Sequence, residues 1–130
     1  MSVHPSNKER LKLPKSIILR GIGVFGNIFK NGFYTNGNQV DARFLIKDTL
    51  PNGLYVGFVA SKRNGNATVR NHQKRLLRET FRLNRRTLHD LAIDKNKRIE
   101  LLLIAKKELS SFEPAQTDVC RHLTYVAQKL

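Results

Sequence analysis

Residues 65–86 read GNATVRNHQKRLLRETFRLNRR, and this stretch has the pattern of one long amphipathic helix. At about 100° per residue, its apolar side chains fall within an arc of roughly 160°, and cations fill much of the opposite arc. The same geometry turns Gln73 toward the packed side, and Asn66 is a suitable N-cap for a helix over residues 67–91. The apolar arc consists of Val69, Leu76, Leu77, Thr80, Phe81, Leu83, Leu88 and Leu91. We therefore expect one side of the helix to pack on a sheet and the other to present a cationic ridge.

The ridge concentrates like charge. Arg70, Lys74, Arg78 and Arg82 follow each other at intervals of four with no acid on that row, and each such pair costs a few tenths of a kcal/mol in an isolated helix. Solvated helix faces usually mix the two signs. The whole chain has 24 Lys and Arg against 10 Asp and Glu, a formal net charge of +14. This excess predicts a polyanionic partner, with nucleic acid favoured over an anionic membrane surface or an acidic protein.

The flanking sequence predicts a single domain at residues 13–130, preceded by a basic arm at residues 1–12. A short helix is expected at about 23–31, and strands at 40–47 and 54–61 are expected to form an antiparallel pair. The apolar run at 98–105 is typical of a strand covered on both faces. A closing helix carries one apolar stripe, formed by Val119, Leu123, Val126 and Leu130.

Several features argue against catalysis by the chain itself. A protein nuclease needs clustered carboxylates or a paired base and nucleophile, whereas the acids here are scattered. The histidines show no metal-ligand spacing and are expected at the surface: His4, His72, His89 and His122. We expect no catalytic and no metal-binding residues. Cys120 is the only cysteine, and the first residues lack the apolar core of a signal peptide, so we expect a cytoplasmic protein.

Aromatic residues offer stacking surfaces for single-stranded nucleic acid. Phe25 and Phe29 lie one turn apart on the first predicted helix, where a stacking role and a core role are equally consistent with the pattern. For Phe44 and Phe58, in the predicted strands, core packing is favoured. A strand rather than a short helix precedes the basic helix, which disfavours a DNA-reading helix-turn-helix.

Three segments, in this order, resemble the protein component of bacterial ribonuclease P. Residues 56–82, VGFVASKRNGNATVRNHQKRLLRETFR, are similar to the family signature V-G-x-x-V-S-K-K-x-G-N-A-V-x-R-N-R-x-K-R-x-x-R-E-x-F-R. Residues 13–32, LPKSIILRGIGVFGNIFKNG, resemble the segment upstream of it. Residues 101–109, LLLIAKKEL, resemble the apolar strand downstream.

The resemblance implies a small α/β (α+β) domain with the element order αβββαβα, a sheet like that of a ribosomal protein S5 domain, and a left-handed crossover. It also implies binding to a catalytic RNA, which performs the Mg²⁺-dependent removal of the 5′ leader from precursor tRNA; the RNA would hold most of the Mg²⁺. The chain would thus be the protein part of an endoribonuclease, with the catalytic RNA and precursor tRNA as partners, and neither membrane nor DNA.

Residue by residue, the family motifs imply two sites. Contacts to the catalytic RNA fall on Lys62, Arg63, Arg70, Asn71, His72, Lys74, Arg75, Arg78 and Arg82. A cleft for the leader falls on Phe25, Phe29 and Phe44. His72 stands where the family usually has arginine, Gln73 where an apolar residue is usual, and Ile18 where arginine is common. The alternative is a ribosomal-type structural RNA-binding protein.

Overall fold

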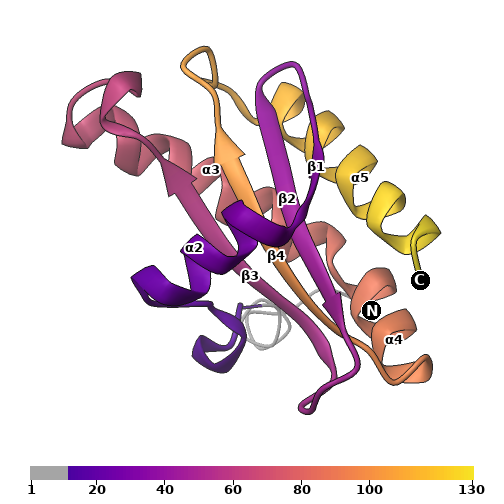
Figure 1. Cartoon of the computed structure of the whole chain (residues 1–130). Coiled ribbons are helices and arrows are strands. Elements are labelled where there is room, and N and C mark those ends of the chain that lie inside the picture. Colours follow the sequence, from indigo (N-terminus) through magenta and orange to yellow (C-terminus); the bar gives the residue numbers. More distant parts are fainter. Residues whose placement is uncertain (1–11) are drawn as a thin grey trace.

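The structure is a computed structural model that describes residues 12–130; residues 1–11 of the expected basic arm lie outside the described part. Two short 3-10 turns, four helices and four strands form one layered domain (Figure 1). In chain order these are η1 (Lys15–Ile17), α2 (Ile22–Asn31), β1 (Phe33–Thr35), β2 (Val40–Lys47), β3 (Gly53–Ala60), η2 (Lys62–Asn64), α3 (Ala67–Asn84), α4 (Arg86–Asp94), β4 (Arg98–Ala105) and α5 (Phe112–Gln128). The predicted αβββαβα order is confirmed, with the second helix divided in two.

The expected antiparallel pairing of the strands at 40–47 and 54–61 is wrong. The sheet order is β1-β2-β4-β3, so β4 lies between the other two long strands. It pairs antiparallel with β2 and parallel with β3, and the partner of β2 on its other side is β1. Ile99, Leu101, Leu103 and Ala105 of β4 are buried in one core and Leu102 in another, so RIELLLIA is fully apolar on one face and partly apolar on the other.

Helices cover the two faces of the sheet unequally. The larger core combines one face with α3, α4 and α5, and it includes Phe44, Leu77 and Val119. The smaller core lies on the other face, where Ile28 of α2 packs with Leu102 of β4. Figure 1 shows α2 crossing this second face, much of which α2 leaves uncovered. Apolar side chains are expected to alternate between the faces, and those of β2 do so.

The predicted continuous helix over 67–91 is interrupted at Arg85, where α3 gives way to α4. The side-chain amide of Asn84 donates to the Thr80 carbonyl oxygen at 2.7 Å and to Gln116 Oε1 at 3.1 Å. Side-chain bonds of this kind compete with the helical backbone ladder. The predicted cap at the other end is confirmed, because the side chain of Asn66 accepts a hydrogen bond from the Val69 N–H.

Helix α5 is tied to the start of β2 by two buried polar side chains. Asp118 Oδ2 accepts hydrogen bonds from the N–H groups of Gln39 and Val40, at 2.6 and 2.9 Å. His122 Nε2 donates to the Val40 carbonyl oxygen at 2.5 Å. The expectation that His122 lies at the surface is wrong, since its side chain is fully buried. Its place on the packed stripe of α5, between Val119 and Leu123, accounts for this burial.

We expect the domain to lose stability as the pH falls below about 6.5. Burial lowers the pKa of His122, and burial also lowers the pKa of His89, whose Nδ1 accepts the Leu54 N–H at 3.2 Å. At a pH between the lowered pKa values of these two histidines and the ordinary pKa of histidine, the unfolded chain binds more protons than the folded chain. Acid therefore favours unfolding. Denaturant titrations at pH 7.5 and about 5.5 should show a lower free energy of unfolding at the lower pH, with a smaller difference in His122→Gln. Equal values at both pH would contradict this prediction.

Candidate nucleic-acid interface

The cationic ridge, defined here as Arg70, Lys74, Arg75, Arg78 and Arg82, runs along the side of α3 away from the sheet. Arg75 and Arg78 are exposed, and the other three are half-buried. Arg82 forms an ion pair with Glu79. Within residues 12–130 the other four form no ion pair. The ridge therefore keeps most of its charge available to an external anion.

The packed side of α3 explains why the ridge faces outward. Gln73, Leu77 and Phe81 are completely buried on this side, as the predicted arc requires. Val69 and Leu83, also assigned to the arc, are instead 39% and 49% exposed. The packed stripe is thus narrower than the sequence suggested.

Contacts with neighbouring groups restrict the side chains of two ridge arginines, Arg70 and Arg78. Arg70 Nε donates to the Gly65 carbonyl oxygen at 3.1 Å, which ties it to the loop before the helix. The guanidinium of Arg78 lies 5.2 Å from the centre of the Phe58 ring. Such contacts reduce the number of rotamers, so less entropy is lost when an anion binds.

The remaining residues expected to contact RNA lie around the first turns of α3. Lys62 and Arg63 are exposed on η2, and Asn71 is exposed one turn into the helix. His72 is also exposed, and its Nε2 donates to the Ser110 carbonyl oxygen at 3.0 Å. His72 therefore holds the loop after β4 against α3. All nine predicted RNA-facing residues are gathered on α3 and on the turn that precedes it.

Gln73 forms a hydrogen-bonded centre beneath this surface. Its Oε1 accepts from Asn64 Nδ2 at 2.8 Å. Its Nε2 donates to the carbonyl oxygens of Lys106 and Leu109, at 3.1 and 3.0 Å. Asn64 in turn donates to the Ala105 carbonyl oxygen at 2.9 Å. One buried side chain thus connects η2, which carries Lys62 and Arg63, to the loop that follows β4.

A second candidate surface lies on the sheet face that α2 crosses. Phe29 is 41% exposed there. The guanidinium of Arg43 lies between two rings, 5.5 Å from the centre of Phe29 and 4.7 Å from that of Tyr34. Arg43 Nη1 also donates to the Phe29 carbonyl oxygen at 3.2 Å, and the Tyr34 hydroxyl donates to Asp41 Oδ2 at 3.0 Å. We call Phe29, Arg43 and Tyr34 the aromatic stack.

Phe25 lies between this surface and the small core. It is half-buried, and its ring covers Gly57 of β3. A side chain at Gly57 would come within 2.7 Å of the Phe25 ring and 2.8 Å of Leu102. The glycine therefore allows the close approach of α2 to the sheet.

The assignment of Phe44 to the leader surface is wrong. Its side chain is completely buried and points to the opposite face of the sheet, where it packs edge-on against Tyr125 of α5 at 6.1 Å. Its neighbour Arg43 points to the open face instead, as expected from the alternation along a strand. Tyr34 pairs with Arg43 across the β1–β2 hairpin and therefore shares its face.

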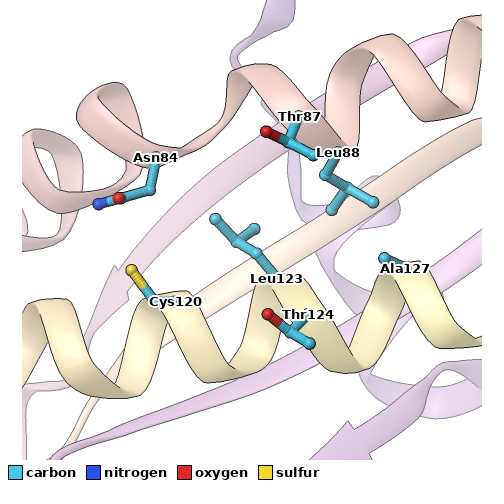
Figure 2. Close-up of a pocket in the computed structure, with 7 residues that line it drawn as sticks. All are labelled: Asn84, Thr87, Leu88, Cys120, Leu123, Thr124 and Ala127. Atoms are coloured by element: carbon cyan, nitrogen blue, oxygen red, sulfur yellow. The ribbon is translucent and has the colours of Figure 1, made fainter.

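The hollow between α3–α4 and α5 has a different character (Figure 2). It has a volume of about 380 Å³ and no charged lining residue. Its lining consists of Asn84, Thr87, Leu88, Cys120, Leu123, Thr124 and Ala127. Burial raises the pKa of the Cys120 thiol, which keeps it in the less reactive protonated form at neutral pH.

Comparison with known proteins identifies the family. The family model described as Ribonuclease P matches residues 13–130. The chain belongs to the ribonuclease P family. It is 33% identical over 106 residues to the ribonuclease P protein component of Petrotoga mobilis, covering 79% of this chain and 73% of that protein. The chain is also 49% identical over 53 residues to the ribonuclease P protein component of Caldanaerobacter subterraneus. This match covers 38% of this chain and 46% of that protein.

The fold agrees with this membership. The ribonuclease P protein of Thermotoga maritima has a TM-score of 0.66 and 25% identity, covering 82% of this chain and 94% of that one. The mixed α/β domain with a four-stranded sheet is thus the fold of bacterial ribonuclease P proteins. No helix within residues 12–130 is long and apolar enough to cross a membrane.

Sequence reasoning missed two members of the aromatic stack in this ribonuclease P family chain. Neither Arg43 nor Tyr34 is among the residues expected to form a site, and no strand is expected at Phe33–Thr35, where Tyr34 lies. Alternation along VDARFLIK does place Arg43 and Phe44 on opposite faces of a strand. The sequence held no signal that α2 would lie on the Arg43 side, because that placement depends on contacts between distant segments.

Proposed function

We propose that this chain is the protein subunit of ribonuclease P. It binds the catalytic RNA through the cationic ridge and the 5′ leader of precursor tRNA through the aromatic stack, and it assists removal of the leader in the cytoplasm. The observation that carries the proposal is that four of the five ridge cations form no ion pair within residues 12–130 of this family member. A phosphate backbone converts their mutual repulsion into attraction and adds the release of counterions.

The arrangement of the two surfaces supports two different RNA ligands. Helices α2 and α3 cover opposite faces of the sheet. One surface carries mainly charge, which suits the backbone of a folded RNA. The other carries exposed rings and one guanidinium, and rings of this kind stack on the bases of single strands.

In this proposal the RNA supplies the hydrolytic chemistry and holds the Mg²⁺. Residues 12–130 contain no group of three His, Cys, Asp or Glu side chains that could hold a metal ion, so the described residues do not fit a resident Mg²⁺ site. The buried carboxylate of Glu100 is held by Lys47 at 3.0 Å and Arg98 at 2.8 Å. That of Asp118 is held by backbone N–H groups. Both acids are thus committed to structural contacts.

Reconstitution tests the proposal directly. The chain is mixed with a bacterial-type catalytic RNA, and cleavage of precursor tRNA is measured at a low Mg²⁺ concentration at which the RNA alone is slow. We expect strong stimulation and a product with the mature 5′ end. No stimulation, together with co-sedimentation of the chain with ribosomal subunits, would favour the structural RNA-binding alternative.

Replacing Phe29 by alanine should reduce the preference for leader-bearing over mature tRNA. If a leader base stacks on this ring, the loss is about 1–3 kcal/mol for the leader-bearing substrate alone. The measurement compares the affinities of the reconstituted enzyme for the two substrates. Phe33 provides a matched control, because it is 51% exposed but lies on the other face against Phe44. An equal loss for both substrates would show that Phe29 serves only the fold.

A further inference from the structure

The stretch before α2, here called the N-terminal segment and covering residues 12–20, is paired with the outer edge of β3 at residues 18–19. Ile18 forms a parallel bridge with Val56, and the Leu19 N–H donates to the Val56 carbonyl oxygen at 2.7 Å. The side chains of Ile17 and Leu19 are buried, whereas Lys15 and Arg20 are exposed. The backbone pairing therefore holds two cations in place at the edge of the sheet.

A cleft of about 490 Å³ separates this segment from α3. We call it the N-terminal cleft; its lining consists of Lys12, Leu13, Lys15, Ile18, Arg20, Arg78, Glu79 and Arg82. Five of these eight side chains are cationic and one is acidic. Arg78 and Arg82 also belong to the cationic ridge, so the cleft continues the ridge toward the β3 edge.

Within the described residues, three of the cations that line the cleft have no acidic partner. Glu79 is paired with Arg82. Within residues 12–130, Lys15, Arg20 and Arg78 form no ion pair. Apolar walls from Leu13 and Ile18 limit solvent screening, and a cleft with one sign of charge raises the local concentration of the opposite ion. The hollow beside α5, with no charged lining, shows that this concentration of charge is not a general property of the molecule's hollows.

We propose that the N-terminal cleft binds a backbone phosphate of the catalytic RNA. This inference rests on the proposed function and extends it to a site that combines the N-terminal segment with α3. The catalytic RNA is favoured over the precursor tRNA because two of the cleft's arginines are part of the ridge. Lys15 and Arg20 then contact the same RNA backbone as the ridge does, from the other wall of the cleft.

The test uses the full chain and the isolated catalytic RNA, with binding measured between about 50 and 200 mM salt. Lys15→Ala and Arg20→Ala should each weaken binding on the order of tenfold, the lower end of the range for a hydrogen bond to a charged group. Each should also lower the salt slope by about one. Arg20→Lys should keep the slope of the unchanged chain, because it keeps the charge.

Lys95→Ala is the matched control, because Lys95 is an exposed cation at the end of α4. Equal affinities and slopes for Arg20→Ala, Lys15→Ala and Lys95→Ala would overturn the proposal. A loss confined to precursor tRNA binding would overturn it as well. Binding and stimulation by the unchanged chain test the proposed function separately, so a failure there is distinguishable from a failure of the cleft. Thermal unfolding of each variant shows whether the fold is retained.

Discussion

A variant with glutamine at Arg70, Lys74 and Arg75 should lose catalytic-RNA binding by about 10³-fold or more while remaining folded. Each charged hydrogen bond to phosphate contributes about 1.5 kcal/mol or more, and each neutralised phosphate contributes about −0.9 to the salt slope. The slope should therefore fall by about two to three units. Filter binding or fluorescence anisotropy over a salt series measures both quantities.

The same variant should be as stable as the unchanged chain or slightly more stable. Arg70 and Lys74 are like charges four residues apart, and removing such a pair relieves a few tenths of a kcal/mol. Arg70 also holds the Gly65 carbonyl oxygen, and a glutamine side chain retains a donor for this contact. A gain or no change in stability combined with lost binding is the expected signature of a functional surface.

A control variant removes equal charge elsewhere. Lys30, Lys95 and Lys129 are exposed on α2, after α4 and after α5. Their replacement by glutamine should leave the catalytic-RNA affinity within a few-fold of the unchanged chain, since nonspecific attraction alone changes. If the ridge variant unfolds but the affinity of its folded fraction is intact, the assignment of the two sides of α3 is reversed.

Gln73→Leu should lower the free energy of unfolding by about 1–3 kcal/mol. Leucine fills a similar volume, so the cost arises from hydrogen bonds rather than from a cavity. The Leu109 carbonyl oxygen would lose the Gln73 donor, and a buried acceptor without a partner costs about 1–3 kcal/mol. The Lys106 carbonyl oxygen would keep its hydrogen bond from the Leu109 N–H at 3.1 Å, so it adds little to the cost. Urea titration measures the change.

Gln128→Leu is the control for this substitution, because Gln128 is exposed at the end of α5 and should change stability by less than about 0.5 kcal/mol. Gln73→Leu should also weaken RNA binding. Asn64 of η2 would lose its hydrogen bond to Gln73, and the same turn carries Lys62 and Arg63. An equally stable Gln73→Leu variant would show that the apolar residue usual in the family serves as well, and that the hydrogen-bonded centre contributes little.

The sequence predicted which side of α3 is packed and which side carries the ridge. The burial of Gln73 and the outward direction of the ridge follow from the helical period, the Asn66 cap follows from the residue preference at helix starts, and the structure confirms all three. The break at Arg85 was missed, because Asn84 bonds there to Gln116 of the distant helix α5. The burial of His122 was missed for a similar reason, since its acceptor is the Val40 carbonyl oxygen in a distant strand.

The surface that carries the aromatic stack was predicted less well. Phe29 is exposed on α2, but Phe44 lies in the core, and Arg43 and Tyr34 lie beside Phe29 instead. Alternation along β2 separates the two faces of the strand without indicating which face each helix will cover. That choice depends on the contacts of Ile28 and Phe25 with β3 and β4.

The amino-acid sequence by itself determined the amphipathic character of α3, the excess of positive charge and the central apolar strand, because periodicity and charge are local properties of a chain. Only the tertiary structure decided that β4 separates β2 from β3, that the ridge and the aromatic stack lie on opposite faces, and that Lys15 and Arg20 meet α3 across a cleft. Each of these depends on pairing between segments far apart in the chain, such as Ile18 with Val56. Pairing of this kind is selected by the packing of the whole domain rather than by the residues of either segment alone.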